Sequence, residues 1–524
     1  MPSPSADGSD RPLYIQKYGG TSVGSPGRMG DVADIVSATH ATHRVVVVLS
    51  AMSSHIKAEG TTSRLLEAAR EVLQPNSSRY LDVIAAIEQS HVGALDAIAV
   101  GALETDAVRS RKQRAKDAAL QDVRAECARL RSFLTAAEII DEISPRSRDV
   151  IISVGEKLAA RIFTAVLESR GIDADYIALD RLIEQPFDPR AIDQTFYDYL
   201  AQRLAAVVGP SLAAGRVPVV TGFFGPTPGG ILATIGRGYT DLTAALLAVG
   251  LRASELQIWK EVDGIFSADP RKVPNAMLIP QITPEEAAEL TYYGSEVIHP
   301  FTMEQAIRAS VPIRIKNTFK PAGEGTGSDP ASATAESPAP FTIERLPTAV
   351  TIKDGITVLN IHSNRKSVSH GFFARIFDTL DRHGVVVDLI STSEVHVSMA
   401  LAPMQRDEPV HDVRAEDALA AGDDAASGVT SPGLRAAIRA LRAYGTVDVI
   451  ANMAILSLVG REMRNMVGNA SRMFSTLAKH NINIEMISQG ASEINISCVI
   501  EAKKGTVAVR AIHDECLGGE QGYR

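Results

Sequence analysis

The sequence predicts an α/β protein with a mostly parallel, three-layer sheet, followed by two smaller modules of strands and helices. Strand-like and helix-like patterns alternate between residues 13 and 320. One strand pattern, Val45–Ser50 (VVVVLS), is apolar almost throughout, which is typical of a parallel strand buried on both faces. Toward the C-terminus a similar segment occurs twice, at Gly371–Leu401 and at Gly468–Ile500.

The composition indicates a globular, cytoplasmic protein. The 524 residues suffice for roughly two to four domains. The net charge of 53 − 62 = −9 argues against nucleic acid or an anionic membrane as the main partner. No apolar run approaches the ~20 residues of a membrane span. Three cysteines lack metal-binding spacing and are interpreted as reduced thiols: Cys127, Cys498 and Cys516.

A glycine-rich turn follows the first predicted strand. The strand pattern Leu13–Gln16 leads into KYGGTSVG (Lys17–Gly24), and a helical pattern follows at Asp31–Ala38. Glycines between a strand and a helix let backbone N–H groups approach phosphate oxygens. The lysine precedes the glycines, so the motif is neither a Walker A loop nor the GxGxxG of dinucleotide folds. The alternative is an ordinary glycine-rich turn with a chance lysine.

The following elements place polar residues where strands end. The expected strands are Asp149–Val154, Ala174–Leu179, Val217–Thr221, Leu256–Val262 and Val311–Ile315. A long charged helical segment, Leu103–Ile140, follows the strand pattern Val45–Ser50 and precedes the strands just named. Thr283-Pro284 predicts the start of a later helix. Ligands of parallel α/β folds bind at the carboxyl ends of strands. The candidate regions at such ends are Lys17, Ser50, Glu156, Thr221 and Lys260.

Two later stretches and one glutamate each have two interpretations. In GRGYTDLTAALLAVG (Gly236–Gly250), Arg237 can clamp a carboxylate, while Thr240 and Asp241 either cap the following helix or face a reaction centre. Glu156, predicted in the first turn of a helix, either interacts with the helix dipole or binds a cationic group. WKEVDGIFSADPRKV (Trp259–Val273) is either a strand with a surface turn or a ligand-binding loop.

The repeated segment predicts two related modules. Leu380 aligns with Leu477 and His383 with His480, and each copy predicts strand, loop, helix, strand, turn, strand. The alternative is two unrelated α/β units that look alike. Lys320–Pro340 is rich in Pro, Gly and Ser and predicts a linker, and acidic, Ala/Gly-rich Arg406–Gly433 predicts a disordered insertion.

These motifs together resemble the aspartokinases of the amino-acid kinase family, and the C-terminal copies resemble a tandem pair of ACT domains. The segments TYYGSEVIHPFTMEQ and VDLISTSEVHVSMAL are most similar to the fungal members. The resemblance implies an αβα amino-acid kinase fold and two βαββαβ ACT domains. It also implies transfer of the γ-phosphoryl of ATP, with Mg²⁺, to the β-carboxylate of L-aspartate, in threonine and methionine biosynthesis.

The resemblance also assigns residues. Lys17 and Asp241 would be catalytic. ATP would be bound by Lys17, Gly19, Gly20, Thr21, Ser22, Lys260, Glu261, Phe266 and Arg271. Aspartate would be bound by Ser50, Thr61, Thr62, Glu156, Arg237, Gly238 and Thr240, with no choice made between the two neighbouring threonines. An amino-acid effector, threonine by expectation, would be bound by Ser369, Phe372, Phe373, Val387, Asp388 and Glu394.

The implied domain plan places one ACT unit within the other. The expected segments are a disordered tail at 1–12, the kinase domain at 13–320, a linker at 321–345, a first ACT core at 354–402 with a return helix at 434–446, an insertion at 403–433, and a second ACT domain from 347–353 and 447–517. ACT sheets commonly pair between subunits, so the resemblance implies a homodimer or a larger homo-oligomer.

One departure keeps other functions open. Many bacterial relatives carry a lysine where this chain has Glu296, which could bind ribose or be structural, and His299 is expected to be structural. A different amino-acid kinase and a non-catalytic amino-acid sensor are the alternatives. Paired ACT modules with Glu156 and Arg237 argue against the first, and the presence of Lys17, Arg237 and Asp241 argues against the second.

Overall fold

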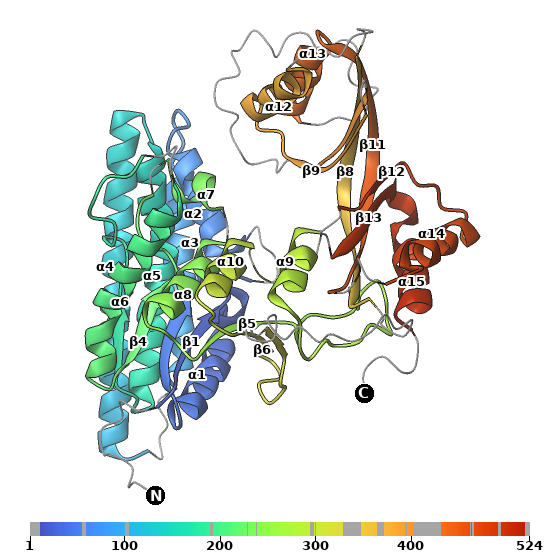
Figure 1. Cartoon of the computed structure of the whole chain (residues 1–524). Helices are drawn as coiled ribbons and strands as arrows, with labels where there is room; N and C mark the ends of the chain where they lie inside the picture. Colours follow the sequence, from blue (N-terminus) through green and yellow to red (C-terminus); the bar gives the residue numbers. More distant parts are fainter. Residues whose placement is uncertain are drawn as a thin grey trace, which may run out of the picture. The chain divides into compact units, whose positions relative to one another are not determined.

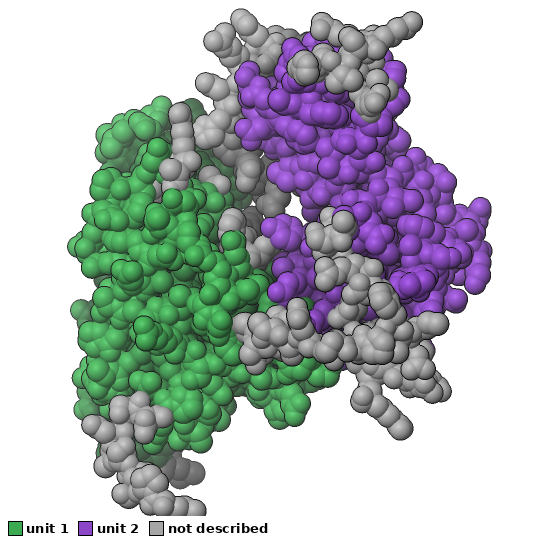
Figure 2. All heavy atoms as spheres, in the orientation of Figure 1, with its two compact units in different colours: residues 1–265, 280–284, 297–335 green, residues 266–279, 285–296, 336–524 purple. Residues whose placement is uncertain are grey.

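The computed structural model describes residues 11–54, 59–99, 104–188, 192–227, 229–236, 238–293, 298, 300–328, 347–363, 371–393, 396–402, 431–461, 463, 466–490 and 494–518. These residues form two compact units (Figures 1 and 2). The first unit takes its residues from 1–265, 280–284 and 297–335, and the second from 266–279, 285–296 and 336–524. No helix in the described ranges is long and apolar enough to span a membrane.

A seven-stranded sheet forms the centre of the first unit, in the order β3-β4-β2-β1-β5-β6-β7. All neighbours are parallel except β6 and β7, which confirms the prediction of a mostly parallel sheet. The strands are β1 (Leu13–Tyr18), β2 (Arg44–Leu49), β3 (Ala174–Ile177), β4 (Val217–Thr221), β5 (Glu255–Lys260), β6 (Ile313–Asn317) and β7 (Thr326–Ser328). β1 is central, and its Lys17 lies between Val48 of β2 and Ile258 of β5.

Helices cover both faces of this sheet. Val45, Val47 and Leu49 of β2 share a core with α1 (Pro26–His40) and α5 (Pro145–Ser169), whereas the alternate residues of β2 point to the opposite face. The remaining helices of the unit are α2 (Thr61–Glu71), α3 (Arg79–Ala94), α4 (Asp106–Ile140), α6 (Gln194–Ala213), α7 (Ile231–Thr234), α8 (Tyr239–Gly250) and α10 (Pro300–Arg308). α8 contacts β1, β2 and β5, so it overlies the centre of the sheet.

The prediction of a strand at Asp149–Val154 is wrong, because these residues belong to α5. The Ser144 side chain caps the helix by accepting from the Ser147 N–H, and Pro145 occupies its first turn. Most of α5 is buried, since it packs against α4 and the sheet. A helix buried on several sides has an apolar run that periodicity does not separate from a buried strand. Glu156 therefore lies in the helix interior and not in its first turn.

Two local expectations also need correction. Neither Thr240 nor Asp241 caps α8 with its side chain, because the N-cap residue is Gly238. The linker expected at 321–345 starts too early, since β7 (Thr326–Ser328) pairs with β6. Gly325 turns the chain into β7 with φ of 74°, a conformation that favours glycine. The predicted helix start is confirmed by α9 (Pro284–Tyr292), of which residues 285–292 belong to the second unit.

The second unit contains an antiparallel six-stranded sheet in the order β12-β13-β11-β8-β10-β9. Its elements are β8 (Ala349–Ser363), α12 (Phe372–Arg382), β9 (Val387–Thr392), β10 (His396–Leu401), α13 (Pro432–Leu441), β11 (Gly445–Val459), α14 (Asn469–Lys479), β12 (Met486–Ser488), β13 (Asn495–Glu501) and α15 (Gly505–Cys516). Figure 1 shows the long strands β8 and β11 running through the whole sheet, with α12 and α13 beside one half and α14 and α15 beside the other.

Both repeat copies adopt the predicted order of elements around these shared strands. One copy supplies α12, β9 and β10, and the other α14, β12 and β13. The first half of β8, Ala349–Lys353, pairs with Ile455–Val459 beside β13, and its second half pairs with the start of β11 beside β10. The expected tail at 1–12 falls outside the described residues apart from Arg11 and Pro12, and the expected insertion at 403–433 apart from its last three residues.

Candidate active site

Four neighbouring strands of the first unit end at one edge of its sheet. Lys17 lies near the end of β1, Ser50 follows β2, Thr221 ends β4 and Lys260 ends β5. The Ser50 N–H donates to the Tyr18 carbonyl, and the Gly222 N–H donates to the Leu49 carbonyl, so the loops after these strands remain joined. The parallel order thus brings together side chains that lie up to 243 residues apart.

Three charged side chains meet at this edge. Lys17 Nζ lies 2.6 Å from Asp241 Oδ1, and the two side chains are only 8% and 9% exposed. Lys260 Nζ lies 3.8 Å from the other oxygen of the same carboxylate. Two ammonium groups beside one carboxylate leave an excess positive charge. In a largely buried setting such a charge attracts an anion such as a phosphate strongly.

The glycine turn packs tightly against the loop after β2. Gly19 and Gly20 lead into a 3₁₀ turn at Thr21–Val23, and Ser25 then caps α1. The Ser53 N–H donates to the Gly20 carbonyl at 3.0 Å. A Cβ on Gly20 would lie 2.2 Å from the backbone oxygen of Ala51, whereas a Cβ on Gly19 would meet nothing within 4 Å. The two glycines therefore serve different purposes.

This difference predicts that alanine at Gly20 and alanine at Gly19 affect the protein in different ways. Gly20→Ala is expected to lower the melting temperature, because a backbone oxygen must move away from the new methyl group. Gly19→Ala is expected to leave the melting temperature unchanged and to weaken the binding of an anionic ligand, because its methyl group points into open space at the charged edge. Thermal unfolding measures the first effect, and titration with a phosphate-bearing ligand measures the second. Equal melting temperatures for the two variants would contradict this account of the turn.

Other residues predicted to hold the nucleotide lie next to this turn. Ser22 Oγ donates to Glu261 Oε1 at 3.3 Å, and lies 3.5 Å from Thr318 Oγ1. Thr318 in turn donates to the Lys260 carbonyl through both its N–H and its hydroxyl. The end of β5, the turn after β1 and the end of β6 are thereby tied to one another.

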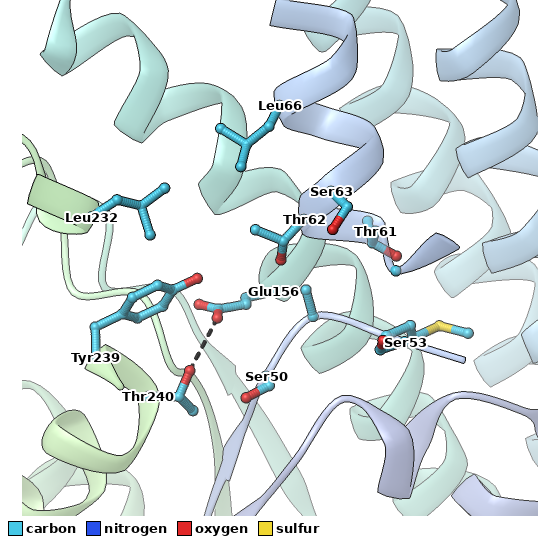
Figure 3. A pocket seen from close by; sticks show the side chains of 13 residues that line it. Ser50, Ser53, Thr61, Thr62, Ser63, Leu66, Glu156, Leu232, Tyr239 and Thr240 are labelled. Carbon is cyan, nitrogen blue, oxygen red and sulfur yellow. Dashed lines mark hydrogen bonds between the residues drawn. The ribbon is translucent and has the colours of Figure 1, made fainter. Parts of the chain in front are cut away.

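A pocket rich in hydroxyl side chains opens beside the charged edge. Figure 3 shows Glu156, Tyr239 and Thr240 pointing toward one another, with Thr62 and Ser63 of α2 nearby. Its lining residues are Ser50, Ala51, Met52, Ser53, Gly60, Thr61, Thr62, Ser63, Leu66, Glu156, Leu232, Tyr239 and Thr240. The pocket therefore contains both threonines between which the sequence does not decide. It also contains Met52, Ser53, Leu232 and Tyr239, which are not among the predicted site residues.

Glu156 is the buried acid of this pocket. It is 1% exposed, and its Oε1 accepts from Thr240 Oγ1 at 3.2 Å. Burial raises the pKa of Glu156 to about 8, while hydrogen bonds from Tyr239 and Thr240 and the charge of Lys17 act in the lowering direction. A buried carboxyl with so high a pKa is stabilised in its charged form by a cation. A ligand that brings an ammonium group would supply one.

Other predicted site residues belong to the second unit, begin α8 or lie outside the described residues. Phe266 and Arg271 belong to the second unit, where Phe266 pairs with Leu278 and Arg271 forms a two-pronged ion pair with Asp269. The Arg271 side chain is 89% exposed. Gly238 is the N-cap of α8. Five residues named from the sequence lie outside the described residues: Arg237, Glu296, His299, Ser369 and Glu394.

The remaining predicted effector residues lie on two elements of the second unit. Phe372 and Phe373 begin α12, the first buried and the second exposed. Val387 and Asp388 begin β9, and Asp388 Oδ2 lies 2.7 Å from Lys353 Nζ of β8.

The fold and the site together are typical of proteins that bind small anionic or polar ligands at the carboxyl edge of a parallel sheet. Residues 12–317 match the amino acid kinase family, and residues 456–516 match the ACT domain. The aspartokinases of Schizosaccharomyces pombe and Saccharomyces cerevisiae are 47% and 46% identical to this chain, each over 96% of the chain and 92% of the relative.

Solved structures agree with these matches. The crystal structure of Escherichia coli aspartokinase III in complex with aspartate and ADP (R-state) has a TM-score of 0.71 and 28% identity, covering 96% of this chain and all of that one. Its complex with lysine and aspartate (T-state) has a TM-score of 0.69 and 26% identity over 96% of this chain and 99% of that one. The chain belongs to the amino acid kinase family and, within it, to the aspartokinases. The predicted family, fold class and kinase activity are thereby confirmed.

Proposed function

We propose that this protein transfers the γ-phosphoryl group of ATP to the β-carboxylate of L-aspartate, giving ADP and 4-phospho-L-aspartate, as the entry step of threonine and methionine biosynthesis. The observation that carries the proposal is the buried Lys17–Asp241 pair next to a pocket that holds Glu156. The E. coli relative, whose structure holds aspartate and ADP, supports it.

The geometry suggests how the chain's own residues act. Lys17 and Lys260 neutralise charge on the phosphates, and the turn after β1 offers backbone N–H groups. Glu156 receives the α-ammonium group of aspartate, and Arg237, by the resemblance, holds the aspartate through a carboxylate. The attacking β-carboxylate is ionised at neutral pH, so no general base is required. Catalysis then rests on positioning and charge stabilisation.

Magnesium is expected to enter with the nucleotide. Among the described residues no three His, Cys, Asp or Glu side chains lie close enough together to hold a metal ion. Asp241, the acid next to Lys17, is already paired with two lysines. Phosphate oxygens commonly supply the ligands of Mg²⁺ in kinases.

An acceptor assay tests the proposed reaction against its alternatives. We expect ADP release with aspartate, and background release with glutamate or without an acceptor. Trapping with hydroxylamine should give aspartate hydroxamate in proportion to ADP, because an acyl phosphate reacts with this nucleophile. Release with another acceptor would favour a different amino-acid kinase. No release with any acceptor, together with amino-acid binding, would favour a sensor.

Inhibition by threonine is the proposed regulation. The matched ACT domain supports an amino-acid effector, and the E. coli relative with lysine shows that an aspartokinase can hold one. Because an inhibitor acts by favouring one state of the protein, we expect threonine to lower activity at subsaturating aspartate, with lysine and methionine weaker. Homodimers or larger assemblies through the ACT sheets are included in this proposal.

A pair of aspartate variants tests where the effector binds. Asp388→Ala, next to Lys353, is expected to require more threonine for half-inhibition. Asp378→Ala, an exposed residue of α12 paired with Arg382, is the matched control and should keep the response of the natural protein. Activity that stays flat at saturating threonine would rule out this effector, and equal responses of both variants would rule out Asp388.

A further inference from the structure

The loop between β4 and α8 shapes one side of the substrate pocket. It supplies Leu232 and leads to Tyr239, both of which line the pocket. Arg237 follows the short helix α7 in sequence. The loop is rich in glycine, and four of its glycines have positive φ: Gly225, Gly229, Gly230 and Gly236. Such a sequence has weak conformational preferences of its own, so something else must fix its path.

Asp149 of α5 is the side chain that contacts this loop with both carboxylate oxygens. The Thr227 N–H donates to Oδ2 at 3.1 Å, and the Ile231 N–H donates to both oxygens at 3.0 Å. Asp149 is 2% exposed. A Cβ on Gly230 would lie 3.3 Å from Pro145 Cβ and 3.7 Å from Asp149 Oδ1, so the loop backbone packs directly on the start of α5.

Backbone N–H groups of the loop stabilise this buried charge. Burial raises the pKa of Asp149 to about 6, and the N–H groups of Ile231 and Thr227 and the charge of Arg148 lower it. A buried carboxylate is costly unless it is hydrogen-bonded. The path of the loop therefore depends on the Asp149 carboxylate. Without its oxygens, the buried N–H groups of Thr227 and Ile231 would lose this acceptor.

We infer that Asp149 is a positioning residue for the acceptor site: it fixes the β4–α8 loop so that Leu232 and Tyr239 line the pocket together with Glu156. Asp149 and Glu156 lie on the same helix, seven residues apart, so α5 supplies the acid of the pocket and anchors the opposite wall. The inference rests on the proposed function for the identity of the ligand.

Steady-state kinetics test the role. For Asp149→Asn and Asp149→Ala we expect the KM for aspartate to rise about tenfold or more, with the larger rise for alanine, since one or both charged acceptors are lost. The KM for ATP and kcat at saturating aspartate should change much less, because ATP lies at the Lys17 edge. Asp198→Asn, an exposed aspartate of α6, is the control and should match the natural protein.

Hydrogen exchange gives a readout independent of activity. In the ligand-free Asn variant, peptides covering 227–234 should exchange faster than in the natural protein, while peptides of β1 and β5 should not change. Two results would overturn the inference. One is a fall in kcat accompanied by similar rises in both KM values, and the other is unchanged hydrogen exchange at 227–234. If the natural protein did not phosphorylate aspartate, the proposed function would fail, whereas the exchange comparison would still decide whether Asp149 anchors the loop.

Discussion

Replacing Lys17 with methionine is expected to lower kcat by about 10³-fold or more, because the variant lacks the buried cation that we propose stabilises the transferring phosphoryl group. Methionine keeps most of the side-chain length and apolar volume. The Lys17 ammonium lies 2.6 Å from the Asp241 carboxylate, whereas the Lys260 ammonium lies 3.8 Å from the same carboxylate. Lys260 is therefore not expected to replace it. Initial rates of ADP release at saturating substrates measure the effect.

Stability must be separated from catalysis in this variant. Removing one partner of a buried ion pair costs about 3–5 kcal/mol, since the other charge stays buried. The double variant Lys17→Met/Asp241→Asn removes both charges and should recover much of the melting temperature while remaining inactive. Lys116→Met, at a surface ion pair with Asp96, is the control for lysine loss. A Lys17→Met enzyme that folds and keeps its kcat would refute the assigned role.

Replacing Glu156 with glutamine is expected to raise the KM for aspartate about 100-fold, because the variant lacks the charge that we propose pairs with the substrate ammonium. The pKa of about 8 adds a pH signature. With that pKa Glu156 is largely neutral at pH 7 without substrate, and the proposed pairing with the substrate ammonium would release a proton. The KM for aspartate should fall as pH rises from 6.5 toward 8.5, and the glutamine variant should lack this dependence.

The same pKa has a consequence for stability, and its sign is opposite to that of an ordinary salt-bridged acid. The folded-state pKa of Glu156 is raised above the usual value of about 4.3, so the folded protein binds more protons between that pH and 8. This residue therefore lowers stability progressively as pH rises through that window. Glu156→Gln should melt higher than the natural protein at pH 8.5 and differ little from it at pH 4.5. The same difference in melting temperature between the variant and the natural protein at both pH values would contradict the raised pKa.

The features of the site that could be predicted from sequence are those set by local pattern. The apolar run of β2 and the strand–glycine–helix order around Lys17 have characteristic signatures. The rule that ligands bind where parallel strands end then brings Lys17, Ser50 and Lys260 together without any knowledge of the strand order.

The features that could not be predicted depend on tertiary packing. The apolar run of α5 predicts a strand, because burial on several sides removes the helical periodicity. That prediction also places Asp149 in a strand, and its contact with a loop 78 residues later has no local signal. Phe266 and Arg271 follow Glu261 closely in sequence, yet they belong to the other compact unit, since the segment 266–279 packs with Val350 and Ile512.

A crystal structure with a non-hydrolysable ATP analogue and aspartate would test the central claim most directly. The account predicts that Lys17 Nζ lies within hydrogen-bond distance of the terminal phosphate, and that the Glu156 carboxylate contacts the ammonium group of aspartate in the pocket of Figure 3. A structure in which Lys17 keeps Asp241 as its sole partner, while the terminal phosphate is bound elsewhere, would contradict it.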